Sequence, residues 1–174
     1  MEVTTGIRNA GQRGQALAEF ALISILLALL LTGAIDFGLL YGHKIELAGA
    51  ARSGARWAAS HPSAWTSAAT PASTTVEGQV ASAGGTLALT NNDSTIAIEY
   101  FAVNGSVLTA CGRWNQQSNA FLAQNGYLQS ACVTPGNLVR VTLTNSYPVL
   151  FGLTGATTGP TTTVQVAAAM LMTG

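Results

Sequence analysis

A glutamate stands at the edge of the most apolar stretch of this sequence, where its charge is chemically unusual. Glu19 directly precedes an uncharged run, Phe20–Ile35, in which leucine, isoleucine and alanine dominate. An ionised carboxylate at mid-membrane costs roughly 2.5–3.5 kcal/mol, so such a residue usually marks a function or a partner. The simpler alternative is an interfacial glutamate whose carboxylate reaches into the lipid headgroups.

The residues before Glu19 provide a way to create a partner for it. Arg13 and Gly14 precede the apolar segment, and cleavage after Gly14 would leave a free amino group on Gln15. Gln15 and Glu19 are four residues apart, so a helix places them on the same face. The new amine and the carboxylate can pair within one chain or between two neighbouring chains. The predicted processing residues are Gly14, Gln15, Glu19 and Phe20, and the predicted pairing residues are Gln15 and Glu19.

Two cysteines, Cys111 and Cys132, flank a polar stretch that reads as a loop. In an exported domain such a pair predicts a disulfide, which stabilises a fold by roughly 3 kcal/mol. Two free thiols in a cytosolic domain are the alternative. Two cysteines with no histidine nearby in the sequence do not make up a zinc site.

The sequence carries no pattern that predicts catalysis. His43 and His61 are the two histidines, and both fit polar positions near a membrane edge or a helix end. No metal-ligand spacing, glycine-rich phosphate loop or nucleophile motif is present. We therefore expect no catalytic residue, no metal and no cofactor. Arg113-Trp114 could form a surface recognition spot, but a tryptophan packed in a loop is the expected role.

One long helix is predicted to position Glu19. No proline occurs between Gln15 and Pro62, and the residue before a proline avoids the helical region, so the helix should end near Ser60 or His61. Its length of roughly 68 Å exceeds a bilayer core of about 30 Å. A buried core helix is the alternative, but a run that is apolar on every face suits lipid better.

This length divides the chain into four expected parts. A leader covers 1–14, a membrane-spanning helix covers 15–41, and the same helix continues outside the membrane over 42–60. A small head covers 61–174. The expected fold class is α+β: a long stem helix followed by a small antiparallel sheet with one short helix.

Small residues recur along the predicted helix. Gly38 and Gly42 are four residues apart, and Ala51, Ala55 and Ala59 continue this spacing. Small residues at this spacing let backbones approach closely. They predict helix packing, either between stems in an oligomer or between the stem and the chain's own head.

The head is predicted from alternation and turn residues. A short helix is expected over Thr75–Ala83, ended by Gly84-Gly85. The expected strands are Thr95–Val103, Val107–Ala110 after an Asn104-Gly105 turn, Leu138–Thr144 and Thr161–Met172. In the third strand, Val139, Val141 and Leu143 should face inward.

Charge is scarce and balanced. Charged residues make up 8 % of the chain, with 7 basic and 7 acidic side chains. No basic patch for nucleic acid is readable, so nucleic acid is not an expected partner. The positive-inside rule does not favour an outward head. Two basic residues, Arg8 and Arg13, precede the apolar segment, whereas three, Lys44, Arg52 and Arg56, follow it. The cysteine pair favours an outward head.

Three segments together resemble a known family. Gly14–Leu22 has a glycine, a glutamate five positions later and an aromatic residue after it, which is the processing signature of type IV prepilins. With Gly33–Gly38 and Ala50–Ala58, it is similar to the TadE-like proteins of the tight-adherence (Tad or Flp) pilus system. Where the signature usually has Glu-Tyr, this chain has Phe20, which keeps the aromatic ring.

The resemblance implies a function and a set of partners. It implies cleavage after Gly14 by a prepilin peptidase, a single-pass location in the bacterial inner membrane, and an extracytoplasmic head. The implied partners are that peptidase, other pilin or pseudopilin subunits, the inner-membrane assembly platform and the lipid bilayer. The implied role is a minor pilin or pseudopilin in a pilus used for adhesion, biofilm formation or secretion.

Two other readings remain open from the residues. Thr32-Gly33-Ala34 resembles a signal-peptidase site, and cleavage there would release a secreted protein beginning at Ile35. The chain could also stay anchored, with Gly14 uncut, as a binding domain that never enters a pilus. The first residue of the mature protein distinguishes these readings.

Overall fold

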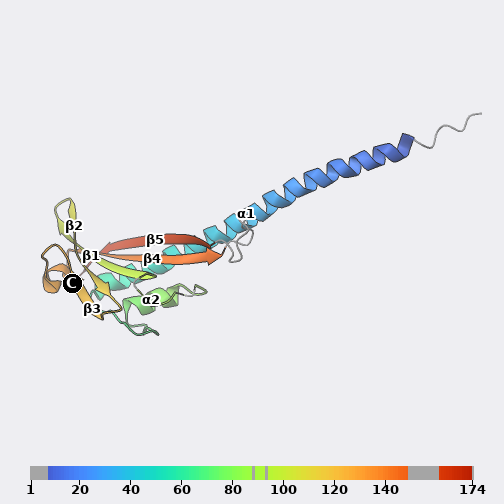
Figure 1. Cartoon of the computed structure of the whole chain (residues 1–174). Helices are drawn as coiled ribbons and strands as arrows, with labels where there is room; N and C mark the ends of the chain where they lie inside the picture. The colour runs from blue at the N-terminus through green and yellow to red at the C-terminus, as the bar shows by residue number, and fades with distance from the viewer. Residues whose placement is uncertain (1–7, 88, 93, 149–160, 174) are drawn as a thin grey trace, which may run out of the picture.

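The computed structural model describes residues 8–87, 89–92, 94–148 and 161–173. The long helix α1 (Arg8–Ser60) carries a compact head on its C-terminal part, while its N-terminal part extends away alone (Figure 1). The fold is α+β, as the sequence predicts. The first seven residues of the expected leader lie outside the described residues.

The end of α1 agrees with the prediction and its beginning does not. The helix ends at Ser60, and the amide of His61 still donates to the carbonyl of Trp57 at 2.9 Å before Pro62 stops the pattern. The helix begins at Arg8, however, not at Gln15. Once the apolar stem has formed a helix, adding turns costs little, and the preceding segment contains no proline to stop it.

Helix α2 (Val76–Ala83) forms where a short helix was expected. The Thr75 hydroxyl caps it by accepting from the amide of Gly78 at 3.1 Å, and Gly84 forms its C-terminal cap. Gly54 of α1 lets α2 approach, because a Cβ at this position would collide with Cγ2 of Val80. The close contact therefore depends on a glycine in the middle of α1.

Five antiparallel strands form one sheet in the order β3-β2-β1-β4-β5. The strands are β1 (Ile96–Asn104), β2 (Val107–Asn115), β3 (Ala120–Ala123), β4 (Leu138–Pro148) and β5 (Thr161–Leu171). Val139, Val141 and Leu143 of β4 are fully buried, as their alternation predicted. The sheet thus buries one face and exposes the other.

The turn between β1 and β2 differs from the prediction by one residue. Asn104 still pairs with Val107, so the loop consists of Gly105 and Ser106 instead of Asn104 and Gly105. Gly105 has φ +62° at the first loop position, a conformation that suits glycine. The return strand β2 also runs on to Asn115, beyond the predicted end at Ala110.

The stretch between the cysteines is not the loop that the sequence indicated. It contains the end of β2, the short strand β3 and a single-turn helix, α3 (Gln129–Cys132). The sequence did not predict these elements, because β3 has only four residues and α3 has one turn, and so short a segment shows no hydrophobic periodicity. The described part of the head therefore has two short helices, where the sequence predicted one.

The core lies between α1 and the inner face of the sheet. Leu47, Ala51 and Ala55 of α1 are fully buried, and β4 and β5 pack against this helix. The segment 61–75 covers another part of the inner face, where Trp65 stacks on Trp114 with ring centroids 4.9 Å apart and also contacts the Tyr100 and Phe121 rings. This loop therefore completes the core over β1, β2 and β3.

Candidate processing site and stem

The predicted processing residues lie on the bare part of α1. The side-chain amide of Gln15 donates to Oε1 of Glu19 at 3.0 Å, so the structure brings the predicted pair together within one chain. Gly14, at the predicted cleavage position, lies inside the helix, and a Cβ there would meet nothing within 4 Å. Phe20 is 70 % exposed. Among the described residues, the site is thus an exposed helical surface.

The uncut chain already gives Glu19 a polar partner. In the structure that partner is a neutral amide, which donates a hydrogen bond but carries no charge. A free amine on Gln15 would add a full positive charge one helical turn from the carboxylate. Cleavage would therefore change the partner of Glu19 from neutral to charged.

The stem beyond Glu19 has the surface of a membrane helix. Leu22 is 71 % exposed and Leu30 is 65 % exposed, because nothing in the described head covers them. One helix of the described chain is long and apolar enough to cross a membrane, and its candidate span is Gly14–Ser60. Ser24 and Thr32 donate their hydroxyls to Ala21 and Leu29 carbonyls of the same helix, which removes unpaired donors from that surface.

The small residues of α1 fall into two groups. Ala51, Ala55 and Ala59 lie in the core beneath the sheet, with at most 7 % of their surface exposed. Gly38 and Gly42 are exposed on the helix, and a Cβ at either would meet nothing within 4 Å. The alanines therefore pack against the chain's own head, and the glycines leave room for contact with another helix. Sequence reasoning did not single out Gly54, which allows the closest helix contact.

A disulfide joins Cys111 of β2 to Cys132 of α3, with Cα atoms 5.5 Å apart. Both cysteines are fully buried. The bond fixes α3 and the chain before it against the sheet. Disulfides persist in oxidising compartments, so this bond suits a head outside the cytoplasm.

A buried polar cluster anchors the 61–75 segment, and sequence reasoning missed it. The Tyr100 hydroxyl donates to the Pro62 carbonyl at 2.7 Å and accepts from Nε1 of Trp65 at 2.6 Å. Glu77 is fully buried beside it, and its Oε1 accepts from the amide of Thr66 at 3.2 Å. The only sequence signal was a glutamate between apolar residues of a short helix.

Burial controls the ionisation of this cluster. Loss of hydration raises the pKa of Glu77 to about 7, although hydrogen bonds from backbone amides oppose the rise. Burial also raises the pKa of Tyr100, so its hydroxyl keeps its proton at neutral pH. Both groups lie in the head and hold the fold; neither lies near Glu19.

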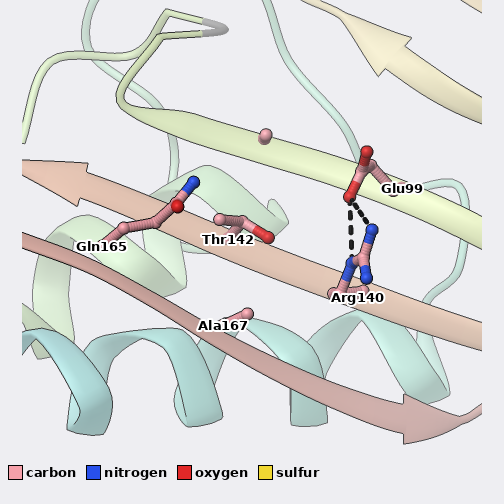
Figure 2. Close-up of a pocket in the computed structure, with 6 residues that line it drawn as sticks. Glu99, Arg140, Thr142, Gln165 and Ala167 are labelled. Carbon is pink, nitrogen blue, oxygen red and sulfur yellow. Dashed lines mark hydrogen bonds and ion pairs between the residues drawn. The ribbon is translucent and has the colours of Figure 1, made fainter.

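The outer face of the sheet carries a shallow groove (Figure 2). Arg140 donates to Oε2 of Glu99 through Nε at 3.0 Å and Nη2 at 2.7 Å, and its guanidinium lies 4.4 Å from the centroid of the Phe101 ring. Thr142, Gln165 and two alanines line the rest of the groove. The Arg140–Glu99 ion pair is half exposed and joins β1 to β4 on this face. The residues that line the groove do not form a catalytic site.

The remaining candidate residues have structural contacts. His61 stacks on Trp57 at 4.1 Å, and His43 lies 4.7 Å from the Tyr147 ring. Trp114 is 8 % exposed and packs on Trp65, although it lies in a strand and not in a loop. Within the described residues, no group of three or more histidine, cysteine, aspartate or glutamate side chains could hold a metal ion.

Comparison with known proteins finds a family match for the stem and none for the head. Residues 14–56 match the family described as TadE-like protein, which is associated with pili and is generally non-enzymatic. No curated protein and no solved structure matches the chain. The matched segment begins at the predicted cleavage glycine and ends within α1, before the head. The resemblance seen in the sequence is confirmed: the segment 14–56 of this chain is TadE-like, on an apolar helix long enough to span a membrane.

Proposed function

We propose that this protein is a minor pilin or pseudopilin of a Tad-type pilus, anchored in the inner membrane and cut after Gly14 by a prepilin peptidase. The observation that carries the proposal is the contact between Gln15 and Glu19 at the base of an exposed apolar helix. The family match covers this same segment and relates the chain to the Tad pilus system.

The first step of the proposed mechanism is hydrolysis of the bond between Gly14 and Gln15. Water adds across this bond and leaves a carboxylate on Gly14 and an amine on Gln15. A helical peptide bond must be locally unwound before a peptidase can hold it. Glycine lowers that cost, because it destabilises a helix by about 1 kcal/mol relative to alanine. Gly14 therefore suits the cleavage position, and its open surroundings leave the bond accessible.

The second step is pairing of the new amine with Glu19. Before cleavage, the carboxylate accepts from the neutral side chain of Gln15 in its own chain. After cleavage, the protonated amine of one chain binds Glu19 of the same chain or of a neighbour. In a low dielectric such a pair attracts strongly, and an unpaired charge is costly. The exposed apolar stems then pack around this contact.

The stem and the head have separate roles in this proposal. The part 15–41 spans the membrane, and Gly38 and Gly42 provide a close-packing surface for other subunits. The part 42–60 holds the head, 61–174, outside the membrane through its buried alanines. The expected partners are the prepilin peptidase, other pilin subunits, the inner-membrane assembly platform and the lipid bilayer.

Mass spectrometry of the full protein extracted from membranes tests the cleavage. We expect an N-terminus at Gln15 in cells with an active prepilin peptidase and an intact leader in cells without it. An N-terminus at Ile35 would instead indicate a secreted protein. An intact leader in cells with the active peptidase would overturn the proposal.

Substitution of Glu19 tests the pairing. We expect Glu19→Ala to be cut normally but to lose most pilus assembly, because the freed amine has no carboxylate to bind. Glu46→Ala is a matched control, since this glutamate is on the same helix and contacts Thr86 of the head instead. Normal piliation of the Glu19→Ala strain would exclude the pairing role.

A further inference from the structure

The segment 61–75 is bonded to a buried carboxylate through its first half. Oε1 of Glu77, at the start of α2, accepts from the amide of Thr66 at 3.2 Å. Glu77 is fully buried, so this bond is kept away from water. The other carboxylate oxygen, Oε2, is also buried and has no hydrogen-bond partner among the described residues. One oxygen of Glu77 therefore holds the segment, and the other lacks a donor.

A buried oxygen without a donor discriminates between the two forms of the carboxyl group. An ionised carboxylate accepts hydrogen bonds at both oxygens, so the missing bond at Oε2 makes its burial costly. A neutral acid carries no charge and can place its proton on Oε2, so its burial costs much less. The closed position of the segment therefore fits a protonated Glu77.

The elements around Glu77 supply no opposite charge. Glu77 forms no ion pair within the part of the chain that the structure describes. Arg52 and Arg56 of α1 and His61 at the start of the segment are exposed. The ionisable group that interacts with Glu77 from β1 is the Tyr100 hydroxyl, and burial raises the pKa of Tyr100, so it stays neutral. An ionised Glu77 would thus remain uncompensated.

The other side chains that hold the segment do not change charge near neutral pH. The Tyr100 hydroxyl anchors it through two neutral hydrogen bonds. The side-chain amide of Asn91 donates to the carbonyls of Thr66 and Ala68 at 3.1 Å and 2.8 Å. Among these described contacts, the bond to Glu77 is the one whose strength a proton can alter.

The two halves of the segment are attached differently. Residues 72–75 stay with α2, because Thr75 caps the helix and Gly78 lets the carbonyl of Ala72 approach it closely. The part 62–68 is held by side chains from β1, from α2 and from residue 91. It can therefore separate from the sheet while residues 72–75 remain in place.

We propose that Glu77 is a proton-dependent latch, which keeps the part 62–68 closed over the sheet as long as its carboxyl group is neutral. Loss of the proton places a charge on a buried group with an unpaired oxygen, and the part 62–68 moves away so that water can hydrate it. Opening uncovers aromatic rings of the sheet, among them Trp114, on which Trp65 stacks. The latch is closed in acid and released as the pH rises.

The pKa of Glu77 determines the pH range of the latch. Loss of hydration raises this pKa to about 7 in the closed state, whereas the ordinary value of 4.5 applies once the group is hydrated. The stabilisation of the closed state is complete below pH 4.5, is lost between pH 4.5 and 7, and changes little above that. These values predict that the equilibrium constant for opening rises about 40-fold between pH 5 and pH 7.

The latch belongs to the head and is independent of cleavage after Gly14. In the proposed location outside the cytoplasm, the head meets the pH of the surroundings, so acidification there would hold the segment closed. This consequence rests on the proposed function, whereas the latch itself does not.

Hydrogen exchange of the full-length protein in detergent tests the latch. The amide of Thr66 reports the opening directly, because its acceptor is Glu77. Its protection factor compares its exchange rate with that of an unstructured chain at the same pH. We expect this factor to fall about 40-fold between pH 5 and pH 7. A factor that stays constant over this range would overturn the proposal.

Glu77→Gln separates the carboxyl group from other causes of a pH dependence. Glutamine keeps an oxygen that can accept from Thr66 but does not titrate, so protection of Thr66 should be the same at pH 5 and pH 7. Glu46→Gln is the matched control and should keep the native pH dependence, because this exposed glutamate of α1 contacts Thr86 instead. The proposal is wrong if Glu77→Gln shows the same pH dependence as the native chain.

Low concentrations of urea separate opening of the segment from unfolding of the whole head. Local opening exposes little surface, so exchange at Thr66 should depend little on urea, whereas exchange at Val141 of β4 should accelerate with it. Equal protection and equal urea dependence at both amides would mean that the segment opens only when the head unfolds, which excludes the latch. The N-terminus is measured separately, so a cut chain without a latch contradicts only this inference, and an uncut chain with a latch contradicts only the proposed function.

Discussion

Gly54 of α1 faces Val80 of α2 so closely that even a methyl group on the glycine would collide with the valine. The contact fixes α2 on the stem helix beside the sheet. It also makes a glycine in the middle of a helix necessary, although glycine weakens a helix by about 1 kcal/mol relative to alanine.

Gly54→Ala should therefore destabilise the head. Forcing a methyl group into a packed contact typically costs 1–3 kcal/mol, which is partly offset by the better helix propensity of alanine. Gly49→Ala is the matched control, because its Cβ would meet nothing within 4 Å, and it should be neutral or stabilising by up to about 1 kcal/mol. Urea unfolding of the full chain in detergent, followed by tryptophan fluorescence, measures both. Equal effects would show that α2 moves away without cost.

The stability of the head should fall as the pH rises from about 4.5 to 7. Burial raises the pKa of Glu77 to about 7, whereas the ordinary value is 4.5, so the folded chain retains a proton that the unfolded chain has lost. Between these values each pH unit costs up to about 1.4 kcal/mol. The free energy of unfolding measured across this range should fall in the native chain. Glu77→Gln, which does not titrate, should lack this part of the slope, and identical slopes would contradict the assignment.

Removal of the disulfide should destabilise the head by about 2–4 kcal/mol. The bond between Cys111 and Cys132 holds α3 against β2, and both sulfur atoms are buried. Cys111→Ala with Cys132→Ala should unfold at lower urea than the native chain, and added reductant should affect only the native chain. A loss of stability in the double variant on adding reductant would point to a cause other than this bond.

Tyr100→Phe should destabilise the anchored loop by about 1–3 kcal/mol. The substitution removes the hydroxyl that accepts from Trp65 and donates to Pro62, and so leaves two buried polar groups unpaired. Hydrogen exchange of residues 61–75 should become faster than in the native chain. Tyr127→Phe is the control, because the Tyr127 hydroxyl accepts only a long bond of 3.4 Å from Asn104 at an exposed position. Similar exchange in both variants would show that the Tyr100 hydroxyl contributes little to holding the loop.

Regular patterns in the sequence predicted most of the fold. The inward positions of β4, the end of the short helix at Gly84 and the end of α1 before Pro62 follow from alternation, glycine at a helix end and proline chemistry. Short elements were missed, since neither β3 nor α3 is long enough to show a period. The start of α1 was also misplaced, because no residue before Gln15 forbids a helix.

In the candidate site, too, local features could be predicted from the sequence and tertiary contacts could not. The four-residue spacing of Gln15 and Glu19 places both on one face of the helix, where the Gln15 side-chain amide contacts Glu19. The pairing of a freed Gln15 amine with Glu19 stays a prediction. The roles of Gly54, Trp65 and Glu77 depend on segments that are distant in sequence, so no local pattern indicated them. The alanines of α1 had two possible partners, and only the tertiary structure shows that they lie under the sheet.

The distance along α1 between Gly14 and the head has a consequence for where the membrane meets the protein. The head packs on the helix at Leu40, and His43 lies against Tyr147, so Gly14 and His43 are about 44 Å apart at 1.5 Å per residue. A bilayer measures about 40–45 Å when its headgroup layers are included. With the stem upright, the scissile bond would lie at one aqueous boundary while His43 and Lys44 reached the other. The base of the head would then rest on lipid phosphates, so bilayer thickness would determine how far the cleavage position protrudes on the opposite side.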